Sequence, residues 1–438
     1  MRTGHTGRRS GVAVLTAATL VVLAATGAAG TATAAAPDGR PATAAATAHG
    51  NGGGQWRGAW AASPHGAGET FVPNWSREGF ANHTLRQVVR VTTGGTRARV
   101  ELSNRYGTTP LRIAGATVAR SDQGAAVRAG SVRQLSFGHG RSVTIPAGGT
   151  VHSDALTFRT RPLEKLTVTL YLAEPTGPAT YHWDAGSTSY RASGDHRSDA
   201  GGEAFIEQSG AWYFLSGVEV SGGPGPRRKS VVAFGDSITD GFGSTPGADN
   251  RYPDELAERL VAAGRTRGVL NHGIGGNQLT NDLSFAGEKG VNRFKKDVLT
   301  EPDVGTVIVL EGINDIGMSE WADLPGGPTP DVPVERLIAG HRELIRQARA
   351  RGIKVIGATL PPYKGAMYYT ERGEAKRDAL NKWIRTSGEY DAVVDLDRAL
   401  ADPADPDRLA PAYDVGDHLH PNDAGYRAMA EAVDLDEL

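Results

Sequence analysis

The stretch that decides the fold is KSVVAFGDSITDGFG, residues 229–243. Its apolar run Val231–Phe234 is short and continuous, which is typical of a strand buried on both faces. The run ends in Gly235-Asp236-Ser237, residue types that favour a tight turn. We therefore expect the hydroxyl of Ser237 at the carboxyl end of a buried strand, where the chain turns into a helix.

The rest of the C-terminal half repeats this strand-to-helix alternation. Four further apolar runs occur at 269–271, 304–310, 354–360 and 392–396, and helical stretches at 253–263, 291–299, 333–350, 372–386 and 423–433. In the stretch 333–350, apolar side chains and His341 fall on one face at helical spacing. The alternation predicts a five-stranded parallel sheet between two helical layers, a flavodoxin-like three-layer α/β/α fold.

The N-terminal half has a different period. Ala98, Val100 and Leu102 alternate with charged residues, and Leu166 to Leu172 alternate with polar ones. Gly- and Pro-containing turns separate these short runs, as in an all-β sandwich. The break between the two halves is expected at the Gly/Pro-rich segment 221–229.

The predicted domain boundaries follow from these patterns. Residues 1–36 are expected to be a signal peptide, because Arg8-Arg9 precedes the apolar run 11–29 and a stretch of small residues. Either the general or the twin-arginine export route fits this pattern. The remainder divides into a low-complexity linker (37–54), an accessory β sandwich (55–222), a second linker (223–229) and an α/β domain (230–438). The mature chain is thus expected to be secreted, without a stable membrane anchor.

The composition of the 438 residues excludes several classes of function. There are 47 Lys and Arg against 49 Asp and Glu, a formal net charge of −2, which gives no basic surface for nucleic acid. The chain has no cysteine, so a cysteine-based zinc site and a thiol nucleophile are excluded. We expect no cofactor and no resident metal.

Polar residues follow four of the predicted strands. They are Gly235-Asp236-Ser237, then His272-Gly273-Ile274-Gly275-Gly276, then Gly312-Ile313-Asn314-Asp315, and after the fifth strand Asp417-His418-Leu419-His420. Because parallel sheets bind ligands beyond the carboxyl ends of their strands, these four blocks are expected to converge.

These blocks resemble those of the SGNH, or GDSL, hydrolase superfamily over about residues 229–438. The resemblance implies an esterase with Ser237 as nucleophile, Asp417 and His420 as its acid–base partners, and Ser237, Gly276 and Asn314 as oxyanion donors. The sequence departs from the family name at Ile238, where many members carry Leu. The oxyanion glycine stays open among Gly273, Gly275 and Gly276.

Elementary chemistry agrees with this assignment. A serine hydroxyl needs a base to become a nucleophile, and histidine titrates near neutral pH. An aspartate three residues before that histidine can fix its tautomer. Each block alone has another interpretation: a turn for Gly-Asp-Ser, a loop for Gly-x-Asn-Asp, and a surface pair or two metal ligands for Asp417 and His420.

Other residues have weaker indications. His272 and His341 are expected to be structural, His418 to be solvated, and Asp236 to stabilise its turn. Five aromatic residues are candidates for a substrate wall: Phe242, Trp321, Tyr363, Tyr368 and Tyr369. In the β half, His182-Trp183-Asp184 and Tyr190 face either the other domain or solvent.

The substrate class remains open at this level. Export combined with a β sandwich resembles two-domain esterases that deacylate plant polysaccharides, so the expected partner is an ester substrate, with acylated polysaccharide as one class. A broad lipolytic esterase, an acyltransferase and a carbohydrate-binding protein with a vestigial hydrolase domain are the alternatives.

Overall fold

The computed structural model describes residues 55–70, 72–223, 228–324 and 327–438, which belong to one compact unit. The predicted signal peptide and the linker after it lie outside the described residues. Within the described part, no helix is both long and apolar enough to span a bilayer.

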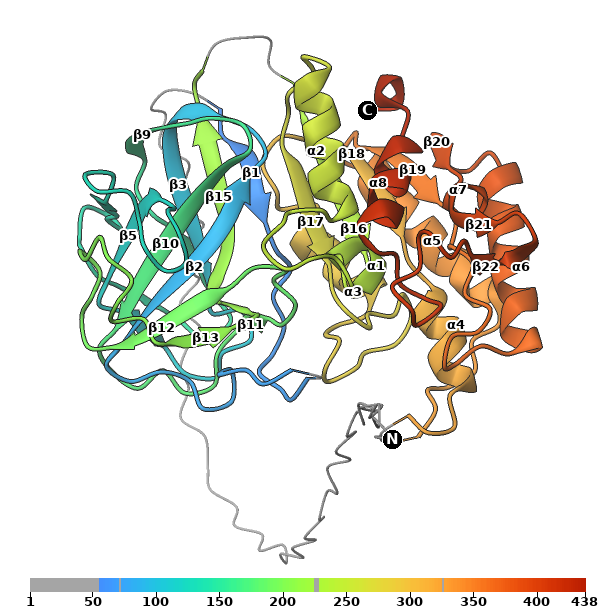
Figure 1. The fold of residues 1–438 in the computed structure, drawn as a ribbon, viewed down its shortest axis with the longest axis horizontal. Coiled ribbons are helices and arrows are strands. Elements are labelled where there is room, and N and C mark those ends of the chain that lie inside the picture. The colour runs from blue at the N-terminus through green and yellow to red at the C-terminus, as the bar shows by residue number, and fades with distance from the viewer. Residues whose placement is uncertain (1–54, 71, 224–227, 325–326) are drawn as a thin grey trace, which may run out of the picture. The chain divides into compact units, whose positions relative to one another are not determined.

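A five-stranded parallel sheet forms the centre of the C-terminal half (Figure 1). Its strands are β16 (Ser230–Gly235), β17 (Val269–Gly273), β18 (Val304–Leu310), β19 (Lys354–Ala358) and β20 (Ala392–Val394). They are arranged in the order β17-β16-β18-β19-β20 and every neighbouring pair is parallel. This is the flavodoxin-like order, and the predicted α/β fold is confirmed.

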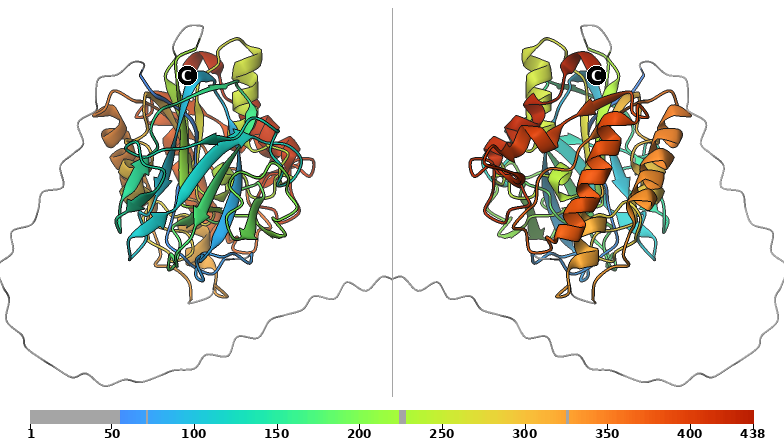
Figure 2. Two further views of the ribbon diagram at one scale, coloured as in Figure 1. Left: turned by 90° about the vertical axis from the view of Figure 1, so that its left-hand side faces the viewer. Right: turned by 90° about the vertical axis from the view of Figure 1, so that its right-hand side faces the viewer.

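Helices cover both faces of this sheet. They are α2 (Tyr252–Ala262), α3 (Gly290–Asp297), α5 (Val334–Arg349), α6 (Glu371–Thr386) and α8 (Asp423–Glu431), each close to its predicted range. The strand order reverses direction after β17, so right-handed crossovers place α2 and α3 on opposite faces. Accordingly α2 packs on α8, while α5 contacts α3 and α6; the right-hand view of Figure 2 shows α5 and α6 side by side.

The sequence did not give bounds for the shorter elements, of which only the turn into a helix at Ser237 was expected. These are α1 (Ser237–Asp240), α4 (Ile313–Glu320), α7 (Leu396–Leu400), β21 (Ala401–Asp402), β22 (Asp405–Leu409) and the 3-10 turn η1 (Leu435–Glu437). The expectation that the block with Asp417 and His420 directly follows the fifth strand is therefore wrong, because α7 and the hairpin β21–β22 intervene. Apart from α4, which has eight residues, these elements have only two to five residues and are too short to show a period.

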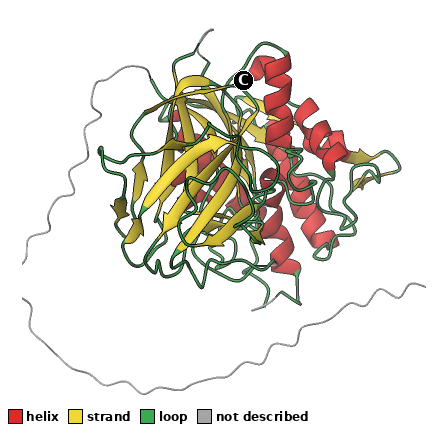
Figure 3. Ribbon diagram, turned by 60° about the vertical axis from the view of Figure 1, so that its left-hand side comes forward, coloured by secondary structure: helices red, strands yellow, loops and turns green. Residues whose placement is uncertain are grey.

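The N-terminal half consists of antiparallel sheets (Figure 3), as predicted. One sheet has the order β1 (Arg57–Ala61), β15 (Leu215–Ser221), β3 (Gly95–Ser103), β8 (Thr150–His152), with β9 (Leu156–Thr160) also paired to β3. The other has the order β13 (Glu207–Ser209), β12 (Ser189–Ser193), β2 (His83–Val91), β10 (Glu164–Leu172), β5 (Gly115–Arg120), β6 (Arg133–Gln134). Two small ladders pair β4 (Leu111–Ile113) with β7 (Val143–Ile145), and β11 (Tyr181–His182) with β14 (Trp212–Tyr213).

The alternation of apolar and polar residues along β10 suggests one buried face and one face exposed to solvent. In the structure both faces are buried. Leu166 to Leu172 bury their apolar side chains in the sandwich core, but Thr167 and Thr169 are buried as well. The segment 194–206 covers this second face, where the buried Arg86 guanidinium donates to the carbonyl oxygens of Ala125 and Gly201. On β10 itself, Thr167 Oγ1 lies 2.8 Å from Ser121 Oγ, so this buried hydroxyl bonds to a protein group.

The two halves share a continuous interface. Strand β1 packs beside β17, and the Val269 N–H donates to Thr92 Oγ1 at 2.9 Å across it. Arg105 Nη1 lies 3.0 Å from Asp297 Oδ1, and Ala61 of β1 packs in the hydrophobic core of the α/β half. The division into an accessory domain and an α/β domain thus stays a prediction.

Candidate active site

Ser237 lies at the turn from β16 into α1. Asp236 caps the helix, because its Oδ1 accepts the Ile238 N–H at 3.0 Å. The strand must end in glycine: a Cβ on Gly235 would lie 2.4 Å from the Leu310 carbonyl oxygen of the neighbouring strand. This tight turn presents the Ser237 side chain beyond the carboxyl end of the sheet.

Three predicted residues form a continuous hydrogen-bond relay. Ser237 Oγ lies 2.8 Å from His420 Nε2, and His420 Nδ1 lies 2.6 Å from Asp417 Oδ2. Ser237 and His420 are 7% and 9% exposed, so both are shielded but reachable. If Nδ1 donates to the carboxylate, the Nε2 lone pair faces the serine hydroxyl, which is the tautomer that a general base needs.

Asp417 is held in its ionised form. Burial works against its charge, but the hydrogen bond from His420 and the backbone N–H groups of His420 and Leu419 outweigh burial and lower the pKa of Asp417 to about 2. Its Oδ1 accepts those two N–H groups at 2.8 and 3.0 Å. The Asp417 carboxylate is therefore held in one orientation, and it is ionised at any pH well above 2.

The glycine block is ordered by hydrogen bonds that distinguish its members. The Gly273 N–H donates to Asn271 Oδ1 at 2.9 Å, and the Gly275 N–H donates to Asp240 Oδ2 at 3.1 Å. Among the described residues, no acceptor is found for the N–H of Gly276, which lines the same cavity as Ser237. Gly276 has φ +77°, a conformation that favours glycine. Of the three glycines, Gly276 alone has an amide available for a ligand.

Asn314 lies in the first turn of α4 with its amide orientation defined. Nδ2 donates to the Asn277 carbonyl oxygen at 3.1 Å, and Oδ1 lies 3.3 Å from the Tyr368 hydroxyl. One Nδ2 hydrogen is used in the first bond, which leaves the second for a ligand in the cavity.

A cavity of about 280 Å³ surrounds these groups. Its polar members are Ser237, Asn314, Asp417 and His420, all near Gly276. Its other lining residues are apolar: Trp183, Phe242, Phe285, Met318, Trp321, Ala366, Met367, Tyr368 and Leu419. Such a cavity suits an apolar group attached to a polar reacting centre.

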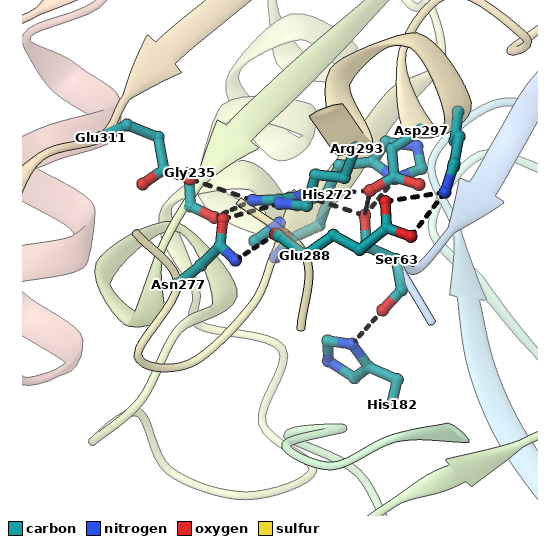
Figure 4. Close-up of polar contacts among 12 residues, drawn as sticks. Ser63, His182, Gly235, His272, Asn277, Glu288, Arg293, Asp297 and Glu311 are labelled. Carbon is teal, nitrogen blue, oxygen red and sulfur yellow. Dashed lines mark hydrogen bonds and ion pairs between the residues drawn. The ribbon is translucent and has the colours of Figure 1, made fainter. Parts of the chain in front are cut away.

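A buried arginine connects several loops and strand ends of the C-terminal half (Figure 4). Arg293 of α3 donates to the Gly235 carbonyl oxygen at 2.7 Å and to Asn277 Oδ1 at 2.7 Å. It also donates to the His272 carbonyl oxygen at 2.8 Å, and it lies 3.0 and 3.2 Å from the carboxyl groups of Glu311 and Asp297. One guanidinium therefore fixes the ends of β16 and β17 against each other.

The comparison with protein families agrees with this geometry. The family model described as GDSL-like Lipase/Acylhydrolase matches residues 233–428. The C-terminal half is a GDSL-like lipase/acylhydrolase domain. This is a family of carboxylic ester hydrolases, so the C-terminal half is the part of the chain that carries the enzyme domain.

The chain is also similar to several solved structures. A lipase/acylhydrolase from Enterococcus faecalis is 20% identical, with 47% of this chain and 93% of that chain covered and a TM-score of 0.36. A carbohydrate acetylesterase from Sinorhizobium meliloti is 17% identical over 47% and 96% of the two chains, with a TM-score of 0.35. A mutant of an acetyl-xylooligosaccharide esterase from Geobacillus stearmophilus is 24% identical over 47% and 91%, with a TM-score of 0.36. No curated protein matches the chain.

The remaining candidates have varied positions in the GDSL-like structure. Phe242, Trp321 and Tyr368 line the cavity, but Tyr363 and Tyr369 do not: Tyr363 is fully buried, with Tyr369 packed against its ring.

The candidate histidines outside the relay each have another polar partner. His272 bonds to Ser63 at 2.9 Å. His341 bonds to Tyr390 at 2.6 Å. The side chain of His418 is 48% exposed and pairs with Asp414, and Tyr190 packs against a small cluster around Phe205.

Sequence reasoning missed the residues that connect the loops. Arg293 stands on a helix with Asp297 four residues later, a spacing equally typical of a surface pair. Trp183, His182 and Asp240 were not assigned to the site. His182 and Asp240 bond to each other although they are 58 residues apart in the sequence. No local pattern marks such a long-range pair.

Proposed function

We propose that the chain is a secreted serine esterase that hydrolyses short-chain carboxylic esters through an acyl-enzyme intermediate, with Ser237, Asp417 and His420 as its catalytic triad. The observation that carries the proposal is the relay of 2.8 and 2.6 Å from Ser237 through His420 to Asp417, beside the available amides of Gly276 and Asn314. The membership of the GDSL-like family supports the same reaction class.

In the first half of the proposed reaction, Ser237 Oγ attacks the ester carbonyl carbon and its proton passes to His420 Nε2. The carbonyl oxygen becomes an oxyanion, which the backbone N–H groups of Ser237 and Gly276 and Asn314 Nδ2 stabilise. Each such donor contributes roughly 10²–10³ to the rate. The carbon–oxygen bond to the alcohol then breaks, and His420 returns the proton to the departing alcohol oxygen.

In the second half, water attacks the acyl-enzyme while His420 accepts one of its protons. The bond to Ser237 breaks, the carboxylic acid leaves, and the proton returns to Ser237 Oγ. Asp417 keeps its charge throughout and stabilises the imidazolium form of His420.

The size of the cavity supports a short acyl group. It has a volume of about 280 Å³ and aromatic walls at Trp183, Phe242 and Trp321. A group of a few carbons is therefore the expected occupant, attached to a carbohydrate or a small alcohol. Secretion is proposed from the N-terminal pattern of Arg8-Arg9 and the apolar run after it.

Replacement of the nucleophile is the direct test. Ser237→Ala should abolish turnover of p-nitrophenyl acetate and prevent covalent labelling by a fluorophosphonate, with the melting temperature almost unchanged. If Ser237→Ala kept more than a few per cent of the activity, the assignment would be wrong.

Two further measurements distinguish the alternatives. Loss of all activity on chelation with EDTA would indicate a metal-dependent reaction, and preferential product formation with an added acceptor alcohol would indicate acyl transfer. Acetate release from acetylated xylan, pectin and chitin, compared with p-nitrophenyl esters, identifies the alcohol part of the substrate.

A further inference from the structure

Trp183 belongs to the β half of the chain but lines the cavity that contains Ser237. It follows directly after β11 (Tyr181–His182) and is 3% exposed. Every other residue that lines the cavity comes from the GDSL-like half. The β half therefore contributes a wall of the site.

The indole of Trp183 is in close contact with the glycine loop. A Cβ added to Gly275 would lie 2.2 Å from Trp183 Cζ2, and the three nearest atoms to it all belong to this indole. The backbone of Gly275 lies outside the left-handed region, so an alanine is excluded there by contact with Trp183 and not by its own conformation. Trp183 is thus seated directly against the loop that presents the Gly276 amide.

The same indole also reaches the base side of the cavity through one aromatic neighbour. The Trp183 and Phe242 ring centroids are 6.4 Å apart, and those of Phe242 and His420 are 4.6 Å apart. Trp183 thus extends the aromatic wall from His420 to the glycine loop. It is the largest side-chain type available for such a wall, and its removal opens the cavity toward the β half.

We propose that Trp183 is a specificity-determining residue that limits the length of the acyl group. The proposal rests on the proposed function, because it assigns the apolar cavity beside Ser237 to the acyl chain. The β half in this view supplies part of the substrate site, so the enzyme's chain-length preference depends on how β11 is seated against the glycine loop.

The first experiment measures kcat/KM for p-nitrophenyl acetate, butyrate and octanoate with wild type, Trp183→Ala and Trp183→Phe. In Trp183→Ala the octanoate-to-acetate ratio should rise at least about 10-fold, since space for one extra methylene is by itself worth about 10-fold or more. Trp183→Phe keeps a smaller aromatic side chain at this position and should raise the octanoate-to-acetate ratio by less. This variant provides the measurement if Trp183→Ala does not fold. Trp75→Ala is the matched control: Trp75 stacks on Tyr213 within the sandwich, outside the cavity, and the ratio should not change.

The second experiment uses the contact with Gly275. Gly275→Ala alone should lose at least about 10-fold in kcat/KM, because the new methyl group displaces the indole or the loop. Gly275→Ala combined with Trp183→Ala should recover most of that loss. A double variant no better than Gly275→Ala would overturn the proposed contact.

The outcomes separate this proposal from the function on which it depends. If Ser237→Ala abolishes hydrolysis but the chain-length ratio of both Trp183 variants equals that of wild type, Trp183 is not a specificity determinant and the esterase assignment stands. If hydrolysis does not depend on Ser237, the proposed function fails first, and the assignment of Trp183 to an acyl site fails with it.

Discussion

His182 of the β half and Asp240 of helix α1 form a buried ion pair, with 3.0 Å between Nε2 and Oδ1. The side chains are 3% and 1% exposed. Both ring nitrogens of His182 face oxygen atoms: Nδ1 lies 2.9 Å from the Ser63 carbonyl oxygen, and Nε2 lies 3.0 Å from the Asp184 carbonyl oxygen as well as near Asp240. Since carbonyl and carboxylate oxygens only accept, the imidazole must donate from both nitrogens and carry a proton on each.

The pair is connected to the glycine loop. Burial is the largest influence and disfavours the charge on His182, but the attraction to Asp240, the hydrogen bonds with Asp240 and the Ser63 carbonyl, and the charge of Asp184 together outweigh burial and raise the pKa of His182. The other oxygen of Asp240 accepts the Gly275 N–H at 3.1 Å. A chain of contacts therefore runs from His182 through Asp240 to the Gly275 N–H, next to Gly276, and we expect His182 to act as a positioning residue for this loop.

His182→Gln should lower kcat for p-nitrophenyl acetate by about 10- to 100-fold, less than the loss of an oxyanion donor itself, with little change in KM. Glutamine can bond to Asp240 but leaves its charge uncompensated. Asp240→Asn should have a similar effect, and the double variant should be no worse than the more impaired single one. The comparison is made well below the melting temperature, with the active fraction counted by fluorophosphonate labelling.

A surface histidine provides the control for this experiment. His196 bonds to Asp199 at 2.8 Å on the outside of the sandwich, so His196→Gln should leave kcat unchanged. A normal kcat in His182→Gln, accompanied only by a lower melting temperature, would reduce His182 to a structural role.

Arg293→Lys should damage both stability and catalysis. The guanidinium donates to three loop acceptors at 2.7 to 2.8 Å, and a lysine ammonium on a shorter, unforked side chain cannot reach all three. We expect a loss of about 2 kcal/mol or more in the free energy of unfolding and at least about 10-fold in kcat, measured by urea denaturation and by ester turnover. Arg346→Lys on the exposed face of α5 is the control, and both quantities should match wild type. An Arg293→Lys enzyme with wild-type kcat would contradict the positioning role.

The sequence was most informative where side-chain period and strand-end chemistry coincide. The run before Gly235 is continuous and apolar and so marks a buried strand, and Ser237, Asn314 and His420 lie within or next to recognisable blocks. The geometry of the Asp417–His420 pair depends on a local turn, in which the backbone N–H groups of Leu419 and His420 donate to Asp417 Oδ1. The close spacing of these residues in the sequence makes that turn possible.

What could not be predicted depends on contacts between distant segments. Trp183 reaches the cavity because β11 of the sandwich is placed against the glycine loop, and nothing near residue 183 in the sequence indicates that contact. The same holds for Arg293, which is buried by loops from two other strands. Packing between distant segments determines where Trp183 and Arg293 lie. The periodic pattern of a single sequence contains no information about such packing.

Asp417→Asn should retain more activity than His420→Ala, because asparagine can still hold the imidazole while removal of the base eliminates proton transfer. The losses in kcat should be roughly 10²–10⁴ for Asp417→Asn and larger for His420→Ala. Equal activity of His420→Ala and wild type would rule out the triad.

The pH profile gives a separate test of the same relay. Because the pKa of Asp417 is lowered to about 2, Asp417 stays ionised through the whole assay range, so protonation of Asp417 does not produce the acidic limb of the wild-type profile. In Asp417→Asn the imidazolium loses its stabilising carboxylate, so the residual activity should persist to lower pH than in wild type. A profile of log kcat/KM against pH checks this shift, and an acidic limb that stays in place would show that Asp417 does not interact with the base.

His152 predicts a pH dependence of stability in the β half. Its Nε2 lies 2.7 Å from Glu219 Oε1 and 3.1 Å from Glu101 Oε2. Burial disfavours the charged imidazole, but the hydrogen bonds with Glu101 and Glu219 outweigh burial and raise the pKa of His152 to about 9. A raised histidine pKa means that the folded state binds the proton more tightly than the unfolded chain, whose histidines titrate near about 6.5.

The stabilisation from His152 should therefore be complete below about pH 6.5 and disappear as the pH rises through about 9. The imidazole is 34% exposed, and solvent screening should limit the effect to about 1 kcal/mol. Urea denaturation of wild type and His152→Gln at pH 6 and pH 10 isolates the contribution of the His152 proton to stability. Glutamine can bond to one carboxylate but does not titrate. The difference in unfolding free energy between the two proteins should favour wild type at pH 6 and shrink at pH 10. A difference that stays constant, or that grows with pH, would mean that the Glu101–His152–Glu219 cluster does not hold a proton in the folded state.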